Sequence, residues 1–131
     1  MKAFILVALV AILAFAAIKF STKTPQEEAF YTALDNFVYM AEPSGVDRHY
    51  RYTTHKRKFI GDCEDFAFTL QSAIGGEVWV VEHDEVSYHA VLLHDDIVYD
   101  NFHQQPIKKA NYPTNFIKPL IFSGKVINNK P

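Results

Sequence analysis

Three side chains, Cys63, His89 and Asp100, follow one another in the order of a thiol acyl-transfer site. Cys63 is the only cysteine of the chain, so it has no disulfide partner within it. A cysteine thiolate is a nucleophile, a histidine can take the thiol proton, and a carboxylate can fix the tautomer of that histidine. The three residue types therefore predict nucleophilic catalysis at a carbonyl group.

The segment around Cys63 predicts a helix that starts at this residue. Asp62 is a natural N-cap, Gly75 and Gly76 end the helix, and one face is apolar (Phe66, Ala67, Leu70 and Ile74). Free N–H groups at a helix start stabilise a thiolate, whereas neighbouring carboxylates raise the pKa of a thiol. Because Asp62, Glu64 and Asp65 flank Cys63, its activation needs a base or a bound cation nearby.

His89 and Asp100 are predicted to meet on one face of a hairpin. Strands are expected over 77–83, 88–94 and 97–101, with Asp95 and Asp96 as a two-residue turn between the last two. In that register His89 and Asp100 are diagonal neighbours, roughly 7–8 Å apart between backbones. The rest of their face is apolar, so the carboxylate of Asp100 needs a partner, and His89 is the candidate.

The stretch GDCEDFA, the strand YHAVLL and the segment VYDN resemble the bacterial transglutaminase-like cysteine peptidases of the LapG type, which cut surface adhesins in the periplasm. The resemblance covers about residues 60–102. It implies an α+β fold with a papain-like or transglutaminase-like core, in which N-terminal helices pack on a small antiparallel sheet. It also implies Cys63 as nucleophile, His89 as general base and Asp100 as the residue that orients the base.

The same resemblance implies a Ca²⁺ site formed by Asp62, Glu64 and Asp65. The alternative for these acids is a solvated helix start that the helix dipole favours. Zinc is disfavoured because the sequence has no HExxH or CxxC spacing.

The expected function is a cysteine peptidase that hydrolyses a peptide or amide bond of an exported or cell-envelope protein. Two enzyme alternatives are a peptidoglycan peptidase of the NlpC type and a transglutaminase. The alternative from another class is a catalytically silent calcium-binding or adaptor module. A loop at 52–55 is expected to supply the second donor of an oxyanion hole, besides the N–H of Cys63.

Residues 1–16 predict a signal peptide cleaved after Ala16, or an N-terminal membrane anchor that extends to about residue 20. Residues 3–18 are free of charge and lie between Lys2 and Lys19, so they are the segment that would hold the protein at a membrane. Either interpretation predicts export, to the periplasm or to the periplasmic face of the inner membrane. A single domain is expected over 24–131.

Amino-acid composition argues against two further classes of protein, those that bind nucleic acid and those that are disordered. The chain has 131 residues, 13 basic and 15 acidic side chains, and 49% hydrophobic residues. This balance gives no general attraction to nucleic acid, and the apolar content excludes a disordered protein. Besides the elements above, a helix is expected from about 25 to 41, a loop over 46–60, and an edge strand over 116–122.

Overall fold

The computed structural model describes residues 22–43, 45–46 and 48–131. The predicted leader at 1–16 and the apolar segment 3–18 lie outside the described residues. Within the described part, no helix is long and apolar enough to cross a membrane.

The described chain forms two α-helices and three sheets, which confirms the α+β class. The helices are α2 (Pro25–Asn36) and α3 (Cys63–Ile74), and a 3₁₀ turn, η1, covers Lys109–Asn111. The largest sheet is antiparallel, with the strand order β7-β6-β5-β4-β8. Its strands are β4 (Glu77–Glu82), β5 (Tyr88–His94), β6 (Ile97–Tyr99), β7 (Ile107–Lys108) and β8 (Phe116–Leu120).

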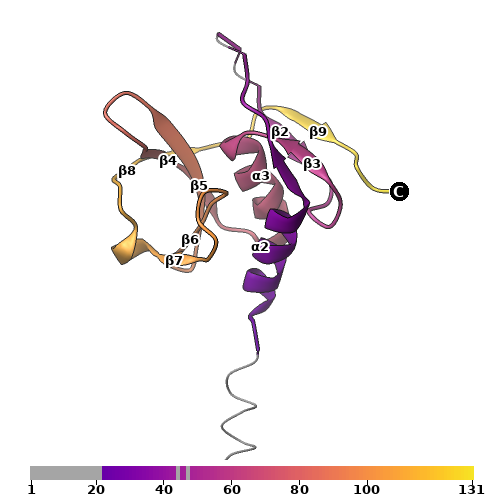
Figure 1. Ribbon diagram of the computed structural model, residues 1–131, viewed down its shortest axis with the longest axis horizontal. Coiled ribbons are helices and arrows are strands. Elements are labelled where there is room, and N and C mark those ends of the chain that lie inside the picture. The colour runs from indigo at the N-terminus through magenta and orange to yellow at the C-terminus, as the bar shows by residue number, and fades with distance from the viewer. Residues whose placement is uncertain (1–21, 44, 47) are drawn as a thin grey trace, which may run out of the picture.

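Two small parallel sheets join segments that are far apart in the chain. In one, β1 (Phe37–Tyr39) pairs with β3 (Phe59–Gly61), and in the other β2 (Tyr50–Tyr52) pairs with β9 (Lys125–Ile127). Figure 1 shows α3 between the five-stranded sheet and the side formed by β2, β3 and β9, in agreement with its contacts to β4, β5, β2 and β3.

The central place of α3 follows from its sequence. Residues 65–70 are all buried, which a surface helix with one apolar face would not show. Phe66 is fully buried, and its ring lies 6.3 Å from Phe30 of α2, 5.1 Å from Phe37 and 6.2 Å from Phe59. These aromatic contacts fix the start of α3, and with it Cys63, against α2 and β3.

Helix α2 is shorter than predicted. Thr24 and Glu27 form the expected capping box, but α2 ends at Asn36, and Phe37 is already extended at φ −84° and ψ 134°. The apolar residues after Asn36 have helical spacing, yet they form β1 because β3 supplies hydrogen bonds that a helix end would lack. The expected loop over 46–60 likewise contains β2 and β3.

The hairpin that presents His89 has the predicted register. Leu92 pairs with Tyr99 and His94 with Ile97 across the turn at Asp95 and Asp96. Both turn residues have positive φ, 48° and 60°, as a two-residue type I′ turn requires. Two strands begin where predicted but are shorter: the one expected over 97–101 ends at Tyr99, and the one expected over 116–122 ends at Leu120.

Candidate active site

Cys63 is the first residue of α3, as predicted. The side chain of Asp62 accepts the N–H groups of Glu64 and Asp65, at 3.1 and 3.3 Å, and Asp65 accepts the N–H of Asp62 at 3.0 Å. This reciprocal capping box fixes the conformation of the residue between its two acids. The thiol therefore projects from a rigid helix start.

The Cys63 sulfur lies against β5. The backbone N–H of Ala90, the residue after His89, hydrogen-bonds to it, and so does the N–H of Glu64. The pairing of β5 with β6 stops at Leu92 and Tyr99, so this part of β5 is open to a residue from α3. The fold thus brings the thiol to the strand that carries His89.

Burial favours the neutral form of the Cys63 thiol. Burial raises its pKa to about 12, despite the hydrogen bond from the N–H of Ala90, and the charges of Asp62 and Glu64 act in the same direction as burial. At neutral pH the nucleophilic thiolate can form only if a neighbouring base takes the proton.

His89 and Asp100 form a buried pair. Nε2 of His89 lies 3.3 Å from Oδ2 of Asp100, and the two residues are 4% and 2% exposed. Because the carboxylate accepts a hydrogen bond, Nε2 carries the proton and Nδ1 is left as the acceptor in the neutral ring. Nδ1 is buried and has no hydrogen-bond partner among the described residues.

Phe102 fixes the plane of the His89 ring. The two rings are stacked, with centroids 4.1 Å apart and planes 8° from parallel. Phe102 is also 46% exposed, so it covers one face of the imidazole and presents its own outer face to solvent. The ring of His89 is therefore held by Asp100 at its edge and by Phe102 at its face.

Asp100 accepts hydrogen bonds from more groups than the sequence indicated. Besides His89, the Tyr112 hydroxyl donates to it at 2.6 Å, and Nδ1 of His103 lies at 2.8 Å. The N–H groups of Phe102 and His103 donate at 3.2 and 2.8 Å. Burial by itself raises the pKa of Asp100, but hydrogen bonds from His89, Tyr112 and His103 outweigh it and hold that pKa well below its usual range.

Tyr112 and His103 are residues of the site that sequence reasoning missed. Tyr112 follows η1, and its own pKa is raised by burial, by its hydrogen bond to Asp100 and by the charges of Asp100 and Cys63. The hydrogen bond from its hydroxyl places Tyr112 against the carboxylate of Asp100. No motif or spacing marked either residue, because each reaches Asp100 through the fold of the segment after β6.

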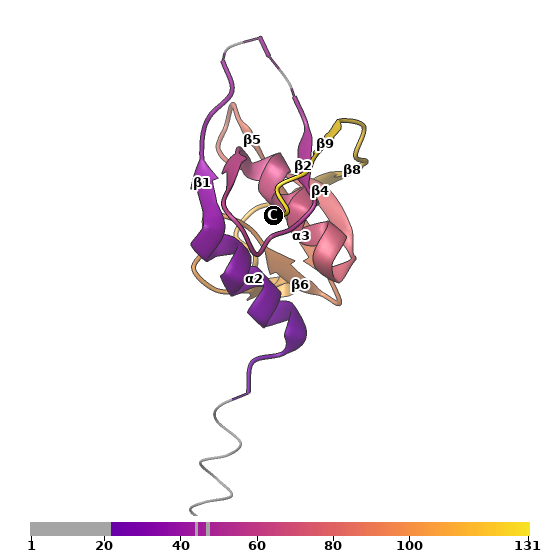
Figure 2. The same cartoon turned by 90° about the vertical axis from the view of Figure 1, so that its right-hand side faces the viewer.

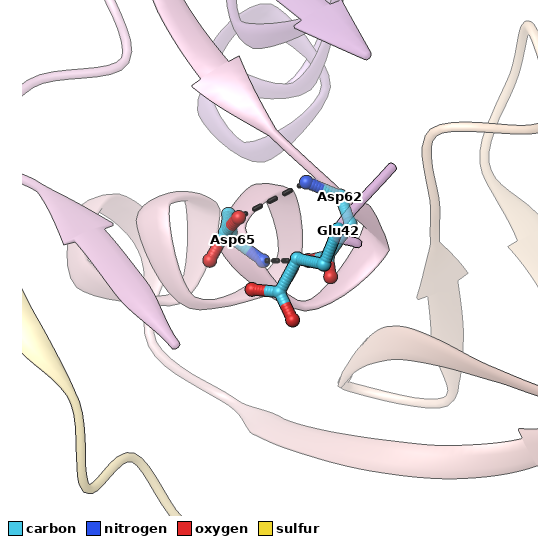
Figure 3. A group of neighbouring side chains, drawn as sticks. All are labelled: Glu42, Asp62 and Asp65. Atoms are coloured by element: carbon cyan, nitrogen blue, oxygen red, sulfur yellow. Dashed lines mark hydrogen bonds between the residues drawn. The ribbon is translucent and has the colours of Figure 1, made fainter. Parts of the chain in front are cut away.

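The acidic residues around Cys63 separate into two groups. Oxygen atoms of Asp62, Asp65 and Glu42 lie within 4.8 Å of one another. Figure 3 shows these three side chains together at the start of α3. Glu64, which was expected to join Asp62 and Asp65 as a calcium ligand, has its Oε2 2.9 Å from Nε2 of His49 and lies outside that group. Glu42 takes its place, and nothing in the sequence linked it to residues 20 positions further on.

This acidic group fits a hard cation in size and chemistry. Carboxylate oxygens bound to Ca²⁺ lie about 2.3–2.6 Å from the ion, and thus at most about 5 Å from one another. Part of the group also has a structural use: Asp65 is 1% exposed and accepts the N–H groups of Tyr50, at 2.6 Å, and Asp62. Burial raises the pKa of Asp65 to about 7, with the charge of Asp62 adding to the effect against these two hydrogen bonds.

Three of the four residues expected to supply an oxyanion donor, at 52–54, have their N–H groups engaged elsewhere. The N–H groups of Tyr52, Thr53 and Thr54 donate to Thr69, Ile127 and Asn129. These bonds attach β2 to α3 and to the C-terminal segment, so this loop does not provide a free donor at those three positions.

Comparison with known proteins assigns the chain to no family. Protein-family models, curated proteins and solved structures were searched, and none of them matches the chain.

Proposed function

We propose that this protein is a cysteine peptidase of the transglutaminase-like type, in which Cys63, His89 and Asp100 form a catalytic triad. The observation that carries the proposal is the buried pair of His89, on β5, and Asp100, which follows β6, together with the Cys63 thiol at the start of the helix packed on β5. No described residue bonds to Nδ1 of His89, so this atom can accept the thiol proton once the thiol approaches it. A papain-like core is part of the same proposal, and the helix start that carries a thiol beside an antiparallel sheet supports it.

In the proposed reaction, Nδ1 of His89 takes the proton of Cys63 as the sulfur attacks a peptide carbonyl carbon. The C–N bond then breaks, His89 gives its proton to the leaving amine, and a thioester to Cys63 remains. Water then adds to the carbonyl carbon of the thioester while His89 takes a proton from this water molecule. The C–S bond breaks, the acid is released, and His89 returns the proton to the sulfur, which regenerates the thiol of Cys63.

Asp100 and its donors orient this base. A carboxylate at Nε2 holds the imidazole in the tautomer with Nδ1 free and stabilises the imidazolium that forms during attack. Hydrolysis is the proposed outcome rather than amine transfer, because water is abundant and no feature of the described residues indicates an amine site. The proposed substrate is an exported or cell-envelope protein, on the basis of the leader predicted at 1–16.

Turnover of a small ester tests the thiol chemistry without knowledge of the natural substrate. We expect the protein to hydrolyse many equivalents of p-nitrophenyl acetate at pH 7, and the Cys63→Ala variant to lose this turnover. A merely reactive thiol would be acetylated once and then stop. Release of one equivalent or less would contradict the proposal and favour the alternative of a catalytically silent binding or adaptor module.

We further propose that Glu42, Asp62 and Asp65 bind Ca²⁺. When bound, the ion would compensate the negative charge of Asp62 next to the thiol. Of these residues, Asp62 and Asp65 also hold the helix start through their hydrogen bonds, so Glu42 is the ligand that can be changed with least effect on α3.

A matched pair of variants separates this ligand set from the one the sequence implied. By calorimetric titration with CaCl₂, we expect Glu42→Gln to weaken Ca²⁺ binding at least about tenfold, because a charged ligand is lost. Glu64→Gln, which changes the acid beside His49, is expected to bind Ca²⁺ like the wild type. If Glu64→Gln instead weakens Ca²⁺ binding and Glu42→Gln does not, the ligands are Asp62, Glu64 and Asp65. If neither the wild type nor the two variants bind Ca²⁺, the calcium site is refuted.

A further inference from the structure

Strand β1 ends beside the thiol. It runs parallel to β3, and Tyr39 is paired with Gly61, which is two residues before Cys63. Burial raises the pKa of the Tyr39 phenol, and the charges of Cys63 and Asp62 act in the same direction. The end of β1 and the start of α3 therefore lie together.

The outer edge of β1 presents free backbone groups. The N–H of Met40 donates to the carbonyl of Gly61 at 2.7 Å, so residues 38 and 40 face β3. In a parallel pair successive residues alternate, and the N–H and C=O of Tyr39 therefore point away from β3. No described residue bonds to them, and Figure 2 shows β1 at the outer margin of the molecule.

This edge lacks the usual protection against pairing. Natural edge strands carry charges or prolines, whereas the chain has neither between Asp35 and Glu42. Val38, Tyr39 and Met40 are instead 42%, 55% and 60% exposed. Edge strands with exposed apolar side chains and unpaired backbone groups bind extended peptides as an added strand.

An exposed apolar side chain also occurs at His89. Phe102, whose ring is stacked on that of His89, is 46% exposed. Exposed apolar side chains thus occur at the end of β1, beside the start of α3, and at the ring of the candidate base.

We propose that an extended, apolar stretch of polypeptide binds along β1 as an additional strand, with its backbone paired to the N–H and C=O of Tyr39. In this binding mode the carbonyl group that reacts is the one that lies nearest the end of β1, because Tyr39 is paired with Gly61, two residues before Cys63. The inference rests on the proposed thiol chemistry of Cys63, and it defines the substrate class as unfolded or extended polypeptide with apolar side chains beside the reacting bond.

Covalent labelling of Cys63 with two reagents tests the inference. The first is an acetylated tetrapeptide chloromethyl ketone rich in valine and leucine, and the second is iodoacetamide, which has no peptide to pair with β1. The measured quantity is the labelling rate with the peptide reagent divided by the rate with iodoacetamide. This ratio corrects for any change in the reactivity of the thiol itself.

We expect Tyr39→Pro to lower the ratio at least about tenfold relative to Tyr39→Ala, because only proline removes the N–H and blocks the edge. The pairing of β1 with β3 uses Val38 and Met40, so proline at position 39 leaves it intact. On the wild-type protein, a reagent methylated at each internal amide nitrogen is expected to lose the same advantage, which gives a second readout that does not depend on a variant folding.

Equal ratios for the two variants and for the two peptide reagents would overturn the inference, as would a wild-type ratio near one. A dimer of the wild type that Tyr39→Pro dissociates would also overturn it, since the edge would then bind a second copy. Labelling by iodoacetamide that is independent of His89 would instead refute the thiol chemistry on which the inference rests, and the two failures are therefore distinguishable.

Discussion

Replacement of His89 by alanine is expected to reduce the turnover of p-nitrophenyl acetate at pH 7 by about 10²–10⁴-fold. The reason is the state of the nucleophile: burial raises the pKa of Cys63 to about 12, so at neutral pH the thiol has no anionic form to contribute. Without a base beside it, the buried thiol is less reactive than a cysteine in a flexible peptide. Steady-state release of p-nitrophenol measures the effect.

His94→Ala is the matched control for this prediction. His94 lies on the same strand, β5, and its Nε2 is 3.2 Å from Asp95, a largely exposed carboxylate in the turn. Within the described part of the chain it bonds to neither the thiol nor Asp100, so its loss is expected to leave turnover within about twofold of wild type. Equal losses in the two variants would show that β5 was disturbed rather than that a base was removed.

Asp100→Asn is expected to impair both catalysis and folding. The carboxylate accepts hydrogen bonds from His89, His103 and Tyr112 as well as from two backbone N–H groups, and an amide turns an N–H toward some of these donors. Loss of one partner in a buried charged network costs about 3–5 kcal/mol. We therefore expect unfolding at a clearly lower urea concentration, and ester turnover reduced at least about a hundredfold because the His89 tautomer is no longer fixed.

The difference in stability between wild type and Asp100→Asn is expected to decrease as the pH falls. The pKa of Asp100 is lowered by folding, so its carboxylate stabilises the native state at pH values above about 4, the ordinary pKa of an aspartate, and this contribution is lost as the pH falls below that value. Urea unfolding of wild type and Asp100→Asn should differ most between pH 5 and 7 and converge below pH 4. Asp95→Asn, in the exposed turn, is the control, and a difference independent of pH would contradict the account.

Local elements of the fold were predictable, and long-range pairings were not. The capping residues Thr24 and Asp62 and the turn at Asp95 and Asp96 follow from interactions within a few residues, and the structure confirms them. Phe37–Tyr39 has apolar spacing that suits a helix, and only its pairing with β3, more than 20 residues away, makes it a strand. The pairing of β2 with β9 spans still more of the chain.

In the candidate active site, too, local contacts were predictable and long-range contacts were not. The register of one hairpin was enough to predict that His89 and Asp100 meet, because both lie within a few residues of a single tight turn. Tyr112 and Glu42 reach the site through loops whose path depends on tertiary packing, and no periodicity marks them. The roles of Cys63, His89 and Asp100 in catalysis stay predictions that the geometry supports.

The most direct test of the central claim is the pH dependence of Cys63 alkylation by iodoacetamide, from pH 5 to 10, in wild type and in His89→Ala. If His89 takes the thiol proton, the wild type should be alkylated readily at or below pH 7. The variant should then need alkaline pH, since burial and the charges of Asp62 and Glu64 favour the neutral thiol and no base takes its proton. Two coincident profiles that rise only near pH 8.5, the ordinary range of a cysteine, or above it, would contradict an activated nucleophile at Cys63.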